Sequence, residues 1–222
     1  MSVAMLATAA LVGCCSECKK EECNKKECAE NVCPNKGCNE VAFDKQAAIV
    51  DNIMTRRSIR DYKDEPVNRE QMAKVLECGI YAPSAINMQA WAVRVVDSKE
   101  FIDGVTQIAV NQDPQLLEQE GFRNIFRNGA AVIFVGAPEG KFAGENIGCL
   151  GQNIMLAATE LGLGTCFLGS AQMIFAEPEM AKYVASLGFS EGYTLRYALA
   201  VGYPDESPEA KPRDLTKIKF VE

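Results

Sequence analysis

From about residue 43 onward, apolar residues recur at the spacings of regular secondary structure. Ile49, Val50, Ile53 and Met54 have helical spacing. Asn68 and Gln71 resemble a capping box at the start of a second helix, and Ser98 is placed to cap a third. Further helices are predicted from four sets of apolar positions: Met72, Val75, Leu76, Gly79 and Ile80; Phe101, Ile102, Val105 and Ile108; Ile147, Leu150, Ile154, Met155 and Ala158; Met180, Tyr183, Val184 and Leu187.

Other apolar runs have the length and pattern of strands. Residues 90–97 alternate, whereas residues 131–136 form a continuous apolar strand bounded by Pro138. Shorter strands are predicted over 164–168 and 194–201, and Gly162 is expected to terminate a helix over 145–161. Helices and strands mix without strict β-α-β alternation, which indicates the α+β class, a central sheet flanked by helices.

The first 42 residues differ in pattern from the rest. Residues 3–12 form a short apolar run ending in Leu11-Val12-Gly13-Cys14, which resembles a bacterial lipoprotein signal with lipidation at Cys14. That signal implies a cell-envelope protein held to the membrane by a lipid anchor. No Lys or Arg precedes the run, so a fortuitous apolar terminus on a cytoplasmic protein remains the alternative.

Residues 15–42 are predicted to be a cysteine-rich tether, joined to a folded domain over 43–222. Cysteines recur every five residues in this segment, and few apolar residues accompany them. We expect an oxidised tether with disulfides, with a soft-metal site or free thiols as alternatives. The cysteines of the repeat are Cys18, Cys23, Cys28, Cys33 and Cys38.

Charge and composition exclude several kinds of chemistry. The net charge of −7 argues against a nucleic-acid surface, which needs a basic face. The chain has no histidine, which excludes Ser-His-Asp catalysis and histidine-ligated metals. Catalysis therefore depends on other side chains or on a cofactor.

Four short motifs could form a ligand site. Thr55–Arg60 carries three arginines and a serine, able to grip a phosphate or to form a solvated helix end. Residues 82–91 form a polar loop between Pro83 and Trp91, or simply a helix stop. The glycines at 162–169 follow a predicted helix and precede a predicted strand. A dinucleotide-binding fingerprint would follow a strand and begin a helix, so this interpretation is rejected. Lys211-Pro212-Arg213 is a second basic cluster or a basic tail.

Taken together and in this order, the motifs resemble the nitroreductase family of flavoenzymes over residues 45–222. The matching sequences are R-R-S-I-R, P-S-x-x-N-x-Q-x-W, G-Q-N-I-M-L-A-A-x-x-L-G-L-G-T-C and G-Y-T-L-R-Y-A-L-A-V-G-Y-P. The resemblance implies a mostly antiparallel sheet and an intertwined homodimer with FMN at the subunit interface. Ala90 stands where many members carry proline, and the stretch between Trp91 and Gln152 is shorter than in the larger members.

The resemblance also assigns flavin-binding roles to individual residues. It implies that Arg56, Ser58, Lys211 and Arg213 hold the flavin phosphate, with Arg57 close by. Arg60 is expected near the pyrimidine edge, and Leu168 and Gly169 would offer backbone N–H groups to the ring. The partner subunit would contribute Pro83, Ser84, Asn87 and Gln89.

The implied activity is transfer of hydride from NADH or NADPH, through FMN, to a small electron-poor acceptor by a ping-pong mechanism. FMN would carry the chemistry without a catalytic side chain. Cys149 and Cys166 lie in apolar helix and strand contexts and Cys78 at a helix end, so all three are interpreted as core thiols. The alternatives are a specialised member, such as a dehalogenase, oxidase or flavin-fragmenting enzyme, or a non-enzymatic surface lipoprotein that binds metal or a redox partner.

Overall fold

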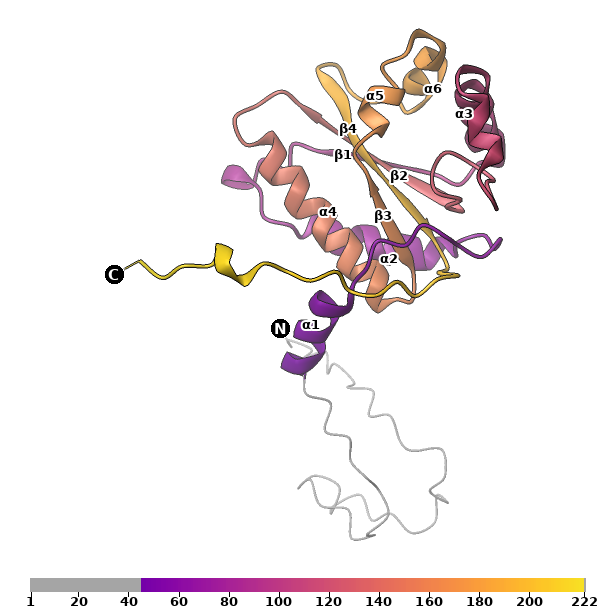
Figure 1. Cartoon of the computed structure of the whole chain (residues 1–222). Coiled ribbons are helices and arrows are strands. Elements are labelled where there is room, and N and C mark those ends of the chain that lie inside the picture. The colour runs from indigo at the N-terminus through magenta and orange to yellow at the C-terminus, as the bar shows by residue number, and fades with distance from the viewer. Residues whose placement is uncertain (1–44, 222) are drawn as a thin grey trace, which may run out of the picture. The chain divides into compact units, whose positions relative to one another are not determined.

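The computed structural model describes residues 45–221, within which four strands form one antiparallel sheet (Figure 1). The strands are β1 (Ala92–Val96), β2 (Ala131–Pro138), β3 (Gly164–Leu168) and β4 (Tyr193–Gly202), in the spatial order β1-β2-β4-β3. The central pair β2 and β4 has Ile133 opposite Leu199 and Phe134 opposite Ala198. The predicted α+β class with an antiparallel sheet is confirmed.

Helices cover both faces of this sheet (Figure 1). On one face, α2 (Arg69–Ile80) and α4 (Ala143–Glu160) pack against Ile133, Val135 and Leu199. On the other face, α3 (Lys99–Gln112), α5 (Ala171–Ile174) and α6 (Ala181–Ser186) pack around Phe134. Because β2 is buried on both sides, its sequence is a continuous apolar run instead of an alternating one.

Two glycines allow close approach between layers. A Cβ atom at Gly151 of α4 would lie 2.5 Å from the Tyr197 hydroxyl oxygen of β4, and that hydroxyl donates to the Ile147 carbonyl at 2.6 Å. At the bulge after Val135, a Cβ at Gly136 would lie 2.9 Å from the Phe189 ring. The helix α4 can therefore approach β4 this closely at Gly151 because glycine has no side chain.

The predicted capping box is half correct. Asn68 Oδ1 accepts hydrogen bonds from the Glu70 and Gln71 backbone N–H groups at 2.9 and 3.0 Å, as an N-cap does. The reciprocal bond from the Gln71 side chain is not made. That amide donates to the Leu161 carbonyl and accepts from the Tyr203 hydroxyl at 3.0 Å, because tertiary partners compete with the local one.

Other differences from the sequence predictions are local. The helix expected from Met180 to Leu187 begins as the 3-10 turn Pro178–Met180 and continues as α6, and the short α5 before it was not predicted. Cys166 is buried as predicted and Cys78 is half-buried, but Cys149 is exposed. Cys149 precedes the fully buried Leu150 on α4, and the rotation of about 100° per residue carries it off the buried face.

The predictions for residues 1–14 and 15–42 lie outside the described residues. Among the helices of residues 45–221, none is long and apolar enough to cross a membrane. The same residues contain no cluster of three or more Cys, Asp or Glu side chains arranged to hold a metal ion.

Candidate functional site

The arginine motif lies along the outer edge of the sheet. It follows α1 (Lys45–Thr55) directly, and Ser58 forms a parallel bridge with Thr165 of the edge strand β3. The Ile59 N–H donates to the Thr165 carbonyl at 2.9 Å, and the Ile59 side chain is buried. These contacts fix the backbone of the motif beside β3.

The segment that follows β4 returns to this same place. Tyr62 and Pro204 form an antiparallel bridge, and the Asp205 N–H donates to the Asp61 carbonyl at 3.1 Å. The tail that continues from this segment brings Arg213 close enough to Arg56 for its positive charge to lower the Arg56 pKa. The fold thus gathers two arginines from opposite ends of the domain.

The Arg56 guanidinium is poised to bind an anion. Its Nη1 is buried and lacks a hydrogen-bond partner among the described residues. Burial lowers the pKa of Arg56, and the charges of Arg57 and Arg213 lower it further. The Thr165 hydroxyl on the adjacent strand is likewise buried and without a partner there. A bound anion would satisfy the guanidinium and relieve the repulsion between the arginines.

The other predicted basic residues lie at the same edge with different partners. Arg57 Nη1 donates to the Met54 and Arg56 carbonyls at 2.8 and 2.9 Å, which caps the end of α1. The Arg60 backbone N–H donates to the Glu206 carboxylate, and Arg60 Nη1 donates to the Ser58 carbonyl at 3.3 Å. Lys211 is exposed, and its carbonyl accepts from Arg213 Nη1 at 2.7 Å.

The polar loop of residues 83–89 is built around the 3-10 turn Ala85–Asn87 and has an unusual backbone. Ile86, Asn87 and Gln89 have φ values of 47°, 56° and 49°, in the left-handed region that non-glycine residues rarely adopt. Ser84 Oγ accepts from the Gln89 N–H at 3.0 Å, and Gln89 Nε2 donates to Asn87 Oδ1 at 3.3 Å. Pro83, Asn87 and Gln89 are exposed, so the loop presents its polar groups outward.

The loop and the arginine motif do not meet within one chain. The loop is tied to the start of α4, where Asn146 Oδ1 accepts from the Ala85 N–H at 2.9 Å. The arginine motif follows Asn52, whose amide contacts Leu156 and Glu160 at the end of α4. Ten to fourteen residues of helix at 1.5 Å each separate the Asn146 anchor from Leu156 and Glu160 by about 15–21 Å.

Residues 53–203 match the nitroreductase family. The chain belongs to the nitroreductase family. The match includes the arginine motif, the polar loop and all four strands of the described sheet.

Individual members of the nitroreductase family resemble the chain over most of its length. It is 29% identical to an FMN reductase [NAD(P)H] of Bacillus subtilis, over 74% of this chain and 69% of that one. A nitroreductase with bound FMN from Desulfitobacterium hafniense is 28% identical, with a TM-score of 0.70 over 78% of this chain and 98% of that one. A nitroreductase with bound FMN from Bacteroides fragilis, 24% identical, shares the fold with a TM-score of 0.69 over 78% and 98%.

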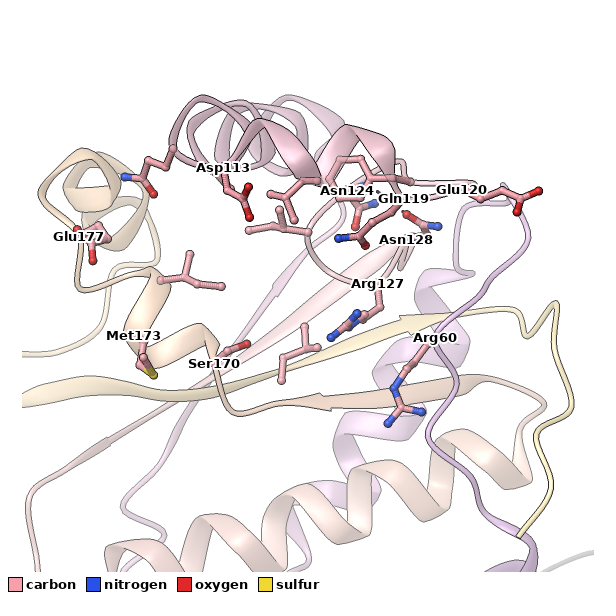
Figure 2. A pocket seen from close by; sticks show the side chains of 17 residues that line it. Arg60, Asp113, Gln119, Glu120, Asn124, Arg127, Asn128, Ser170, Met173 and Glu177 are labelled. Atoms are coloured by element: carbon pink, nitrogen blue, oxygen red, sulfur yellow. Dashed lines mark hydrogen bonds between the residues drawn. The ribbon is translucent and has the colours of Figure 1, made fainter. Parts of the chain in front are cut away.

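In this family member, a cavity of about 580 Å³ opens at the carboxyl end of β3 (Figure 2). Leu168 and Arg60, both predicted site residues, line it, and the exposed Gly169 follows Leu168 directly. Arg127 and Ser170 also line the cavity, and sequence reasoning did not identify either. The Asn128-Gly129 pair was a turn signal that could have directed attention to Arg127.

The Cys166 thiol is buried in β3, within the electrostatic influence of several arginines. Burial raises the pKa of Cys166, and the charges of Arg60, Arg127 and Arg56 oppose the rise. Three guanidinium groups from two segments, the arginine motif and the loop at Arg127, therefore act on this thiol, and the Glu206 carboxylate acts in the opposite sense. Their gathering is a local positive region in a chain whose net charge is −7.

Proposed function

We propose that this nitroreductase-family protein binds FMN and uses it to pass hydride from NADH or NADPH to a small electron-poor acceptor, such as a nitroaromatic compound or a quinone. The observation that carries the proposal is the unpartnered, buried Nη1 of Arg56 beside the charge of Arg213. Relatives named FMN reductase [NAD(P)H] and NADPH-flavin oxidoreductase support the same activity.

The residues at the edge of β3 suit the phosphate end of FMN. Arg56 and Arg213 offer charged donors to a phosphate dianion, and Ser58 and Lys211 lie in the same two segments. Arg57 adds positive charge beside them, although its Nη1 is engaged with the end of α1.

The residues near the cavity suit the ring. Arg60 places positive charge where the resemblance expects the pyrimidine edge, which favours negative charge on the reduced ring. Leu168 and Gly169 lie at the end of the edge strand β3, where the resemblance expects their backbone N–H groups to face acceptors on the ring. When bound, FMN would supply the hydride-transfer chemistry between NAD(P)H and the acceptor, and these residues would bind and orient it.

We further infer that the site is completed by a second copy of the chain. The polar loop of residues 83–89 is anchored about 15–21 Å along α4 from the contacts of Asn52, which precedes the arginine motif, so it is not placed to serve the same flavin. In a homodimer, Pro83, Ser84, Asn87 and Gln89 of one copy would reach the flavin bound by the other copy.

The activity is tested with the purified protein. We expect a flavin absorption spectrum, oxidation of NADH or NADPH, and parallel double-reciprocal plots when donor and acceptor are varied, because both would use one flavin in turn. A colourless protein that fails to bind added FMN would refute the proposal. Intersecting plots with a demonstrated ternary complex would refute the ping-pong order alone.

We also propose that the protein is a lipoprotein of the cell envelope. Support comes from the sequence Leu11-Val12-Gly13-Cys14, with the cysteine-rich residues 15–42 as a tether to the catalytic domain. Deleting residues 1–40 should leave FMN content and turnover nearly intact and abolish membrane association, measured by fractionation. Loss of FMN on deletion, or a full-length protein found in the cytoplasm, would contradict this proposal.

A further inference from the structure

The cavity at the carboxyl end of β3 is lined by two arginines that form no ion pair among the described residues. The side chains of Arg60 and Arg127 come from segments 67 residues apart in sequence, and both line this cavity (Figure 2). Neither guanidinium forms an ion pair with a carboxylate among residues 45–221. Both charges also act on the buried Cys166 thiol, where the nearby Glu206 carboxylate opposes them.

Arg127 is held in place by a strained and clamped loop. Arg127 and Asn128 are consecutive non-glycine residues with φ values of 55° and 62°, a conformation that persists only when the surroundings impose it. The Asn128 side chain supplies that constraint. Its Oδ1 accepts from the Arg123 and Asn124 N–H groups at 2.8 and 3.2 Å, and its Nδ2 donates to the Gly121 carbonyl at 2.8 Å.

Within the described part of the chain, the Arg127 side chain is not fixed by polar contacts of its own. Its side chain is exposed and makes no hydrogen bond among the described residues, so the packing of the fold does not account for its position. Backbone strain of this kind concentrates at ligand sites, where a side chain must be presented in one orientation. The loop thus presents a free guanidinium toward the cavity.

The three acidic residues that line the cavity lie apart from Arg60 and Arg127 (Figure 2). Glu120 points away from it and Glu177 lies across from the arginines, beyond Met173 (Figure 2). Asp113 is engaged as a cap, accepting from the Gln115 N–H at 3.2 Å. The cavity is therefore positive near the end of β3 and acidic across from it, which suits a small ligand with a single anionic group.

We propose that this cavity is the acceptor site and selects acceptors that carry an anionic group, a carboxylate or sulfonate, held between Arg60 and Arg127. The inference rests on the proposed function, because it takes the flavin ring to lie at Leu168 and Gly169, next to the cavity. A planar carboxylate matches the paired N–H donors of a guanidinium. An electron-poor aromatic acid would then be a better acceptor than its neutral amide.

The test compares benzoate and benzamide, which are not reduced, on the FMN-containing protein. Calorimetry should show that benzoate binds more tightly than benzamide. Arg127→Gln should weaken benzoate binding at least tenfold and change benzamide binding little. Arg127→Lys should retain part of the affinity, because it keeps the charge but loses the paired donors. Arg69→Gln is the matched control, since Arg69 is exposed and paired with Asp97 at 2.9 Å.

Activity provides a second, independent readout. The ratio of kcat/KM for 4-nitrobenzoate to that for 4-nitrobenzamide should fall at least tenfold in Arg127→Gln and stay unchanged in Arg69→Gln. Unchanged benzoate affinity in Arg127→Gln would overturn the inference. So would a lower affinity for FMN with equal losses for both acceptors, which would assign Arg127 to the flavin.

Two further outcomes would distinguish an acceptor site from a site for the NADPH phosphate, and the failure of the acceptor site from the failure of the proposed function. A rise in KM for NADPH but not NADH in Arg127→Gln, with benzoate binding intact, would assign the positive charge to the donor's phosphate and overturn an acceptor role. A protein that binds no FMN and oxidises neither nicotinamide would refute the proposed function itself. A flavin-containing protein whose benzoate affinity ignores Arg127 would refute only the acceptor site.

Discussion

At the scale of single residues, the site is defined by cations that lack anionic partners. Arg56 is half-buried with an unpartnered Nη1, and Arg213 approaches it from the C-terminal segment. Burying a guanidinium is costly unless it is paired, so this arrangement does not stabilise the fold in the absence of a ligand. The arrangement is reasonable in a protein that binds a phosphate group.

The phosphate assignment is tested by removing each arginine. Each charged hydrogen bond contributes about 1.5–3 kcal/mol, so Arg56→Ala and Arg213→Ala should each weaken FMN affinity by about tenfold or more. Flavin fluorescence during titration of the flavin-free protein measures the dissociation constant. Arg69→Ala, at an exposed position, should leave it unchanged. Wild-type affinity in both site variants would disprove the assignment.

At the scale of elements, the contact of α4 with β4 positions both halves of the site. The start of α4 holds the polar loop through Asn146, and its end holds α1 through Asn52. Gly151 lies between these anchors and allows the helix to approach Tyr197 closely. A shift of α4 would therefore displace the loop and the arginine motif together.

A methyl group added at Gly151 should disturb this packing. The new Cβ would lie 2.5 Å from the Tyr197 hydroxyl oxygen, so Gly151→Ala should lower the free energy of unfolding by about 1–3 kcal/mol. Gly148→Ala on the same helix is the control. Nothing lies within 4 Å of its Cβ, and alanine favours a helix over glycine by about 1 kcal/mol. Chemical denaturation measures both, and equal stability of the two variants would contradict the packing argument.

At the scale of the whole molecule, the described chain leaves an apolar surface uncovered. Ile49, Val50, Ile53 and Met54 on α1 are 51–70% exposed, and Phe220 and Val221 in the C-terminal tail are 96% exposed. Exposed apolar side chains of this number on one helix and on one tail mark interaction surfaces. The proposed homodimer would cover them and bring the polar loop to the second flavin.

A charge placed on α1 should therefore separate the subunits. Ile53→Asp should shift the sedimentation coefficient toward that of a monomer and release FMN, because each monomer would hold only part of the site. Leu117→Asp is the control, since Leu117 is 64% exposed in the 3-10 turn Pro114–Glu118, away from α1 in sequence. A wild-type monomer that retains FMN would refute the dimer proposal.

The sequence by itself determined the elements and the family. Helical spacing, the apolar run at 131–136 and the caps at Asn68 and Ser98 depend on neighbours within a few residues, so they can be read locally. The order of the arginine motif, the polar loop and the basic tail identified the nitroreductase resemblance, and the match over residues 53–203 confirmed it.

Tertiary structure decided which of these residues meet. The approach of Arg213 to Arg56, the separation of the polar loop from both and the cavity with Arg127 depend on how strands pair and how α4 lies across the sheet. The sequence did not predict the exposure of Cys149 or the hydrogen bonds of the Gln71 side chain with Leu161 and Tyr203, for the same reason. Contacts between distant segments are set by the packing of the whole core, which local patterns do not encode.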